Sequence, residues 1–191
     1  MKRLPKSTLI RLGWLSLAML FLVSGVILTA VIGYQATHQN NSANKASQTA
    51  NNLTCRSDPS IKVNQPAAGS FSDTKLASFA PSSKISQLGC IDITVGSGAI
   101  AQADSTVSVN YVGALAKDGT IFESSYKSGQ PISFSLTQVI PGWSLGLPGM
   151  KVGGVRRLLI PAAQAYGSQS PSAAIPANSD LVFDISLISV N

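Results

Sequence analysis

Six aromatic side chains recur through the second half of the chain, with no acid, base or nucleophile among them at the usual catalytic spacings. The apolar run Val139–Trp143 lies in the middle of this set. This combination predicts an aromatic-walled pocket, in which any chemistry depends on binding rather than on proton transfer or covalent attack. The aromatic residues are Tyr111, Phe122, Phe134, Trp143, Tyr166 and Phe183.

Other chemistries lack the residues that they need. The single histidine, His38, lies far from the aromatic set, which argues against a metal site and against a histidine-dependent hydrolase. The formal charge of +6 includes four cations within residues 1–11, and the rest of the chain carries ten Lys/Arg against eight Asp/Glu. A nucleic-acid surface is therefore not expected. The predicted chemistry depends on binding alone, so it requires no cofactor.

Short strands and one short helix must position the aromatic residues. Lys117–Thr120 is typical of a hairpin turn, and Gly142–Leu147, followed by Pro148-Gly149, fits a short helix. The predicted fold class is α+β, an antiparallel twisted sheet wrapped around one short helix, in a domain that covers residues 86–191. Short apolar runs, several of them alternating with polar residues, predict strands over 91–95, 106–112, 121–124, 132–136, 155–160 and 181–188.

The residues before this domain predict a membrane anchor and a linker. Residues 12–34 are uncharged and mostly apolar, and as a helix they would span about 34 Å, enough for a hydrocarbon core of about 30 Å. A cleaved signal peptide is the alternative, although its apolar core usually covers only about 7–15 residues. The basic flank 1–11 places the N-terminus in the cytoplasm and everything beyond Tyr34 outside it.

Two further segments separate the anchor from the domain. Residues 35–54 are small and polar, and they predict a flexible linker because they cannot bury enough apolar surface to become ordered. Residues 55–85 form an extension of uncertain order without a helical or strand period. This extension either packs loosely on the following domain or is not ordered.

Eight short motifs follow one another along the predicted domain. They are Tyr111–Gly113, Asp118–Phe122, Val139–Trp143, Gly149–Gly154, Arg156–Leu158, Ile160–Pro161, Ala165–Gly167 and Leu181–Asp184. In this order and spacing they resemble an FKBP-type peptidyl-prolyl cis-trans isomerase domain, over about residues 88–190.

The resemblance implies a pocket with Trp143 as its floor. It also implies that the backbone N–H of Ile140 and the hydroxyl of Tyr166 hold the carbonyl groups of a ligand. The chain departs from the family at Glu123, where Asp is usual, at Ile132, where an aromatic residue is usual, and in segment 168–175, which lacks a bulky residue beside Ile175. The candidate catalytic residues are Tyr111, Phe122, Glu123, Ile140, Trp143, Tyr166 and Phe183, and the candidate substrate-binding residues are Ile132, Val139 and Ile175.

An apolar pocket suits the isomerase activity that the resemblance implies. Rotation of an amide costs about 18–20 kcal/mol because the twisted state loses its resonance. The twisted carbonyl is less polarised and loses less on leaving water, so an apolar pocket favours the transition state. The expected substrates are X-Pro bonds of exported or surface polypeptides, and the expected membrane contact is the N-terminal helix. The alternatives are a non-catalytic chaperone module that binds proline peptides and an anchored structural domain in which the aromatic residues only pack.

Cys55 and Cys90 are the only cysteines, and both are expected outside the cytoplasm, where disulfides persist. A bond between them would stabilise the fold by roughly 3–4 kcal/mol through the entropy of the unfolded chain. Two free thiols remain the alternative, because the sequence does not give the distance between them.

Overall fold

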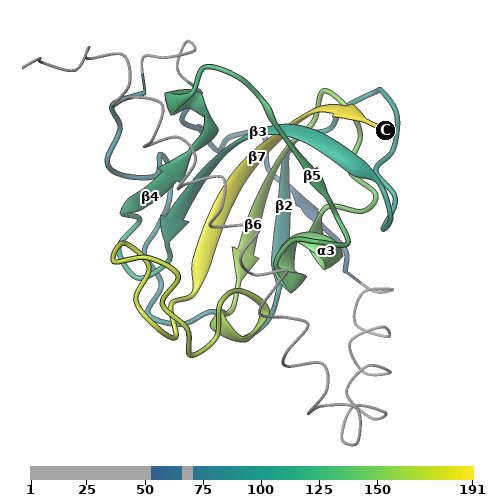
Figure 1. The fold of residues 1–191 in the computed structure, drawn as a ribbon. Coiled ribbons are helices and arrows are strands. Elements are labelled where there is room, and N and C mark those ends of the chain that lie inside the picture. Colours follow the sequence, from purple (N-terminus) through teal and green to yellow (C-terminus); the bar gives the residue numbers. More distant parts are fainter. Residues whose placement is uncertain (1–52, 66–70) are drawn as a thin grey trace, which may run out of the picture. The chain divides into compact units, whose positions relative to one another are not determined.

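The computed structural model describes residues 53–65 and 71–191, which contain a seven-stranded sheet and one short α-helix (Figure 1). The helix is α3 (Pro141–Gly146), and two 3₁₀ turns, η1 (Ser125–Lys127) and η2 (Ala162–Gln164), follow β4 and β6. The strands are β1 (Arg56–Ser57), β2 (Gly89–Thr94), β3 (Thr106–Leu115), β4 (Ile121–Ser124), β5 (Ile132–Ser135), β6 (Val155–Ile160) and β7 (Leu181–Val190).

The strand order is β1-β2-β6-β7-β3-β4, and β5 pairs with the first half of β3. Strands β3 and β7 form the longest ladder, which runs from Val107 opposite Val190 to Leu115 opposite Leu181. Each pair is antiparallel except β1 with β2, which is parallel. The predicted antiparallel sheet over one short helix is therefore confirmed for β2 to β7, and β1 makes the whole sheet mixed.

Helix α3 lies close against one face of this sheet because two glycines face β6. A Cβ atom on Gly142 would lie 2.5 Å from Ile160 Cγ2, and one on Gly146 would lie 2.8 Å from Leu158 Cδ2. Side chains on the helix face would hold the two elements apart. The glycines thus allow the short helix to share one core with the sheet, and Trp143 belongs to that core.

The other face of the sheet is covered by residues 71–85, part of the extension whose order the sequence left open. Leu76 is buried there against Val112 and Val182. The Arg157 guanidinium donates to the carbonyl oxygens of Ala77 and Ser78, both at 2.8 Å. These residues therefore pack on the domain.

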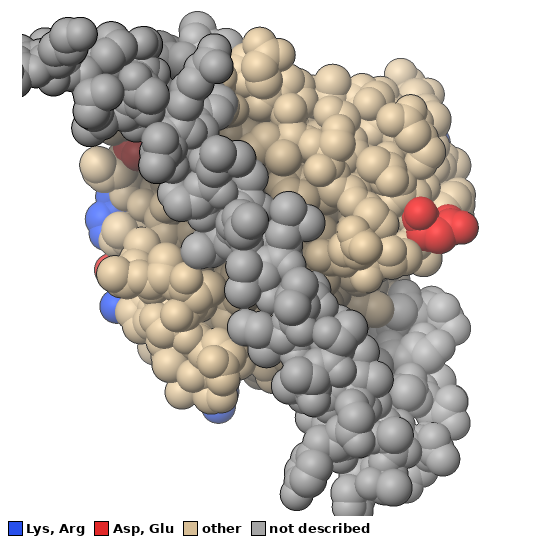
Figure 2. Space-filling model, in the orientation of Figure 1, with Lys and Arg blue, Asp and Glu red and all other residues tan. Residues whose placement is uncertain are grey.

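The predicted membrane span, residues 12–34, lies outside the described residues, as do the basic flank 1–11 and most of the linker 35–54 (grey in Figure 2). Within residues 53–65 and 71–191, no helix has the length and apolar character needed to cross a membrane.

Candidate functional site

Trp143, on α3, lies at the centre of an aromatic cluster built from several elements. Its ring centroid is 5.5 Å from that of Tyr111 on β3, 5.4 Å from that of Phe134 on β5 and 5.3 Å from that of Phe183 on β7. The three interplanar angles lie between 82° and 87°. Such edge-to-face pairs contribute about 0.5–1.5 kcal/mol each beyond the burial of their area. The indole ring is therefore held rigidly from three sides.

Phe122, on β4, joins the cluster through Phe183, at a centroid distance of 5.7 Å and an angle of 84°. Gly113 makes this contact possible. A Cβ atom at Gly113 would lie 2.7 Å from Phe122 Cζ and 2.8 Å from Phe183 Cε1. Any larger residue at this position would push the two rings apart.

The predicted apolar site residues belong to the same core cluster. Tyr111, Ile140, Trp143, Ile175 and Phe183 are buried, and Phe122, Ile132, Val139 and Tyr166 are partly buried against them. The chain thus brings together residues from β3, β4, β5, β7, the start of α3 and the loop after η2. The partly buried members keep part of their surface exposed, and the roles of all these residues in binding stay predictions.

Glu123 supplies the negative charge of the site. Pairing between β3 and β4 shifts register between Gly113 and Ala114, and such a bulge can redirect side chains toward a site. The Glu123 Oε1 atom accepts a hydrogen bond from the Ser124 N–H at 2.9 Å. Burial raises the pKa of Tyr166 to about 12, and the Glu123 carboxylate contributes to this increase. Burial, with the same carboxylate, also raises the pKa of Tyr111 above its ordinary value.

The indole N–H of Trp143 is a buried donor that has no hydrogen-bond acceptor among the described residues. Leaving such a group unpaired costs about 1–3 kcal/mol. Native proteins leave few polar groups in this state, and each one calls for an explanation.

Phe134 belongs to the aromatic cluster but was not among the candidate site residues. Besides Trp143 it contacts Tyr111, with ring centroids 6.1 Å apart. The sequence contains a signal for it, because Phe134 lies two residues after Ile132 and alternate residues of a strand share one face. The predicted aromatic set already contained Phe134, and the strand pattern is a reason to add it to the candidate substrate-binding residues as well.

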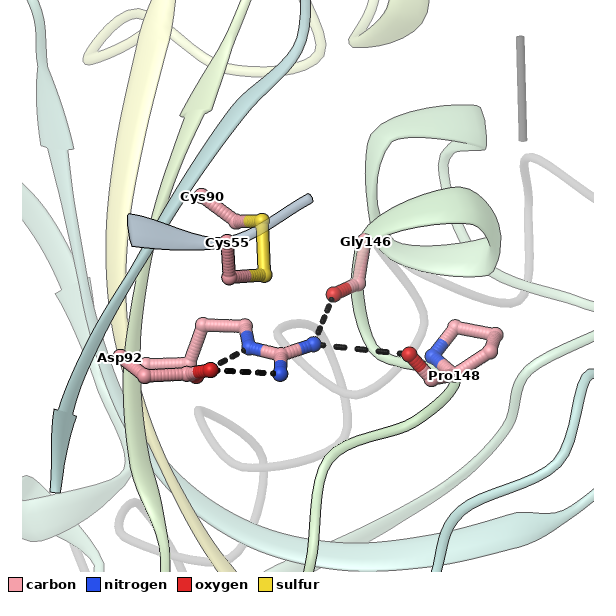
Figure 3. The surroundings of a disulfide bond; sticks show 6 residues. Cys55, Cys90, Asp92, Gly146 and Pro148 are labelled. Carbon is pink, nitrogen blue, oxygen red and sulfur yellow. Dashed lines mark hydrogen bonds and ion pairs between the residues drawn. A yellow bond between two sulfur atoms is a disulfide. The ribbon is translucent and has the colours of Figure 1, made fainter. Parts of the chain in front are cut away.

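Cys55 and Cys90 are joined by a disulfide, with their Cα atoms 4.7 Å apart. Close to this bond, the Arg156 guanidinium donates to the Asp92 carboxylate at 2.7 and 3.2 Å (Figure 3). It also donates to the Gly146 carbonyl oxygen at 2.8 Å. Arg156 therefore ties the C-terminal end of α3 to β2.

Two cavities lie away from the aromatic cluster. One, of about 340 Å³, lies next to the disulfide and is bordered by Cys55, Leu145 and Arg156. The other, of about 250 Å³, lies between residues 82–83 and residues 176–180. The apolar set around Trp143, rather than either cavity, matches the chemistry that the motifs predict.

Comparison with known proteins identifies the domain. Residues 98–188 match the family model for FKBP-type peptidyl-prolyl cis-trans isomerase. A peptidyl-prolyl cis-trans isomerase of Saccharomyces cerevisiae is 44% identical over 114 residues, which are 58% of this chain and 27% of that protein. Peptidyl-prolyl cis-trans isomerase FPR2 of the same yeast is 48% identical over 86 residues, which are 44% of this chain and 64% of FPR2.

A solved structure gives the same result. The peptidyl-prolyl cis-trans isomerase of Pseudomonas syringae pv. tomato is 38% identical, with a TM-score of 0.51, over 58% of this chain and 80% of that one. The chain belongs to the FKBP-type peptidyl-prolyl cis-trans isomerase family, which confirms the resemblance seen in the motifs. It spans about a quarter of the length of the first yeast relative and less than two thirds of FPR2.

Proposed function

We propose that this domain catalyses cis-trans isomerisation of X-Pro bonds by binding the twisted amide against the Trp143-centred cluster. The observation that carries this proposal is the edge-to-face arrangement of Trp143 with Tyr111, Phe134 and Phe183. The rings in this arrangement are rigid and apolar, and the domain that holds them belongs to the isomerase family, so we expect them to form the binding surface. The proline ring packs on Trp143, and Phe122 and Tyr166 flank it.

The chemistry needs no proton transfer. A twisted amide has a less polarised carbonyl than a planar one, so it loses less when the cluster removes it from water. Preferential binding of about 8 kcal/mol accounts for a millionfold acceleration. Tyr166 donates its neutral hydroxyl to a substrate carbonyl, and the buried rings exclude water from the bond that rotates.

A protease-coupled proline-peptide assay on the full chain tests this proposal. Phe122→Ala removes a side chain whose burial is worth about 1.5–3 kcal/mol, so kcat/KM should fall about tenfold or more. Tyr166→Phe removes one hydrogen bond of about 0.5–1.5 kcal/mol and should cost about two- to twelvefold. Phe71→Leu, on the other face of the sheet, serves as the control and should leave the rate unchanged.

A fluorescence-polarisation measurement of peptide affinity, made beside this assay, separates isomerase activity from binding alone. Peptide binding without acceleration by the unmodified chain would contradict catalysis and support the non-catalytic chaperone module. If the chain neither bound the peptides nor accelerated their isomerisation, the aromatic cluster would have a packing role only.

Anchoring in a membrane, with the domain outside the cytoplasm, is part of the same proposal. The uncharged run 12–34 and its basic flank support it. The Cys55–Cys90 disulfide also supports it, because such bonds persist in oxidising compartments. The substrates would then be exported or surface polypeptides. External protease on intact cells should release the domain, whereas protection until lysis would contradict this orientation.

A further inference from the structure

Glu123 differs from the other partly or fully buried acids of the described chain in having few partners. Asp184 pairs with Arg157 at 2.6 Å and Asp92 pairs with Arg156 at 2.7 Å. Asp180 accepts from the backbone N–H groups of two other segments. Among the described residues, Glu123 accepts only from the N–H of the next residue, Ser124.

Within the described residues, no Lys or Arg nitrogen lies within ion-pair distance of the Glu123 carboxylate. The ion pairs found there are Arg56–Asp58, Lys75–Asp118, Arg156–Asp92 and Arg157–Asp184. The Oε2 atom of Glu123 likewise has no donor in this part of the chain. One carboxylate oxygen therefore remains available to a ligand.

This carboxylate lies at the rim of the candidate site. Glu123 follows Phe122, whose ring contacts Phe183, and their strand β4 is the last in the strand order. The side chain is only partly buried and is therefore accessible. The titratable groups whose charge it influences, Tyr111 and Tyr166, are neutral at physiological pH.

The surroundings strengthen the field of this single charge. A charge beside apolar rings acts through a lower effective dielectric than a charge in bulk water. A cation carried by a substrate would therefore find one nearby opposite charge and a free acceptor oxygen.

We propose that Glu123 is a specificity-determining residue that favours peptides with a lysine or arginine next to the isomerised proline. This inference rests on the proposed function, because it assigns a substrate preference to the same site. The ammonium or guanidinium group of the substrate donates to the free Glu123 oxygen while the proline ring occupies the cluster. Neutral or acidic side chains at the same position lack this contact.

Matched peptides isolate the charge in a direct test. Lysine and norleucine have side chains of similar length that differ in the ammonium group, so one pair places them before proline and a second pair places them after it. The full chain is assayed in non-ionic detergent at about 20 mM and about 0.5 M salt, because salt screens partly exposed charges. At low salt, kcat/KM should favour lysine by about fivefold or more in at least one pair, and high salt should reduce this ratio.

Three variants assign the preference to Glu123. Glu123→Gln keeps an oxygen that can accept from Ser124 and should bring the lysine-to-norleucine ratio to about one. Glu123→Asp keeps the charge and should retain most of the preference. Asp104→Asn removes an exposed acid elsewhere and should leave the ratio as it is in the unmodified chain. Thermal melting checks that each variant is folded.

The outcomes also separate this proposal from the proposed function. An equal ratio in Glu123→Gln and the unmodified chain would overturn the role of Glu123, whatever the overall rate. If no peptide is turned over, isomerase activity is refuted, and fluorescence polarisation of the same labelled peptides measures their affinity. A lysine preference that Glu123→Gln abolishes in those affinities would still support the contact, and equal affinities would reject it.

Discussion

Tyr111 and Tyr166 carry the titratable hydroxyl groups of the aromatic cluster, and burial keeps both protonated. The pKa of Tyr166 is raised to about 12 and that of Tyr111 also lies above its ordinary value. A raised tyrosine pKa favours the neutral form, so both hydroxyls are hydrogen-bond donors rather than bases at physiological pH. In the proposed function, the site would therefore hold a bound carbonyl through neutral hydroxyl groups, without exchanging protons with it.

A flat pH profile is the expected consequence. The isomerisation rate of a peptide without ionisable groups should not change between about pH 6 and 9, because both hydroxyls stay neutral there. Above about pH 10 the unfolded chain ionises its tyrosines before the folded chain does. The melting temperature should therefore fall as pH rises toward 12. A bell-shaped rate profile within pH 6–9 would indicate general acid–base catalysis instead.

The sequence predicts which residues belong to the candidate site where the side-chain type alone, such as an aromatic ring, indicates a role. The aromatic set could be selected from its chemistry and spacing, and it converges on Trp143. The isolation of the Glu123 charge could not be predicted, because it depends on which cations the fold brings near. The pairing of Arg157 with Asp184 was missed for the same reason, since β6 and β7 bring these residues together.

At the scale of elements, the contact between α3 and β6 determines where Trp143 lies. Gly142 and Gly146 are one helical turn apart and face alternate residues of β6, Ile160 and Leu158. The helix spans only Pro141–Gly146, too short to be stable without this packing. The two glycines thus position the aromatic site through the helix.

Gly142→Ala should lower the free energy of unfolding by about 1–3 kcal/mol, although alanine is the better helix former. The added methyl group would lie 2.5 to 2.9 Å from three side-chain atoms of Ile160. Denaturant unfolding measures the effect. In the double variant with Ile160→Ala the overlap disappears, so the two changes should cost less together than their sum. Simple additivity would contradict steric overlap as the cause.

Asp184→Asn should destabilise the fold by about 3–5 kcal/mol, because it leaves the Arg157 guanidinium buried without its counter-charge. The side chains of Arg157 and Asp184 are only 3% and 4% exposed. Thermal or chemical unfolding gives the measurement. Asp118→Asn is the matched control, since it weakens an exposed pair with Lys75 at 3.8 Å and should have little effect. Equal losses in both variants would argue against burial as the reason.

The predicted strands 121–124 and 155–160 agree with β4 and β6, because turn residues or proline bound them. Strand β3 continues to Leu115, three residues past its predicted end. Gly113 interrupts the alternation of apolar and polar residues that predicted this strand. The contact between Phe122 and Phe183 nevertheless needs a glycine at this position. Strand β1 was not predicted, since two exposed residues carry no alternation and their pairing depends on β2.

At the scale of the whole domain, residues before β2 complete the fold from two sides. Residues 71–85 cover one face of the sheet, and β1 extends its edge beside β2. The disulfide connects Cys55, the residue before β1, to Cys90 on β2 across a sequence separation of 35. The stable unit is therefore larger than the family match, which begins at residue 98.

Removal of the disulfide should show how much the covalent link between Cys55 and Cys90 contributes to the stability of the fold. Replacing both Cys55 and Cys90 by serine should lower the free energy of unfolding by about 3–4 kcal/mol, because the unfolded chain regains the entropy of the open loop. Thermal melting with and without reductant checks this expectation. Reductant should destabilise the natural chain and leave the double variant unchanged. If reductant lowered the melting temperature of both equally, the effect would not come from this bond.

The position of the disulfide also decides how the domain would bear a mechanical load. Tension applied through the residues before Cys55 reaches β2 at Cys90 directly through the covalent bond, so the residues between the two cysteines, which are separated by 35 in sequence, carry no force. In a single-molecule pulling experiment, the oxidised chain should release about 120 Å less contour length than the reduced chain, at about 3.4 Å per residue. A stretched N-terminal tether would therefore pull on β2 without first peeling away the strand and the covering segment that precede it.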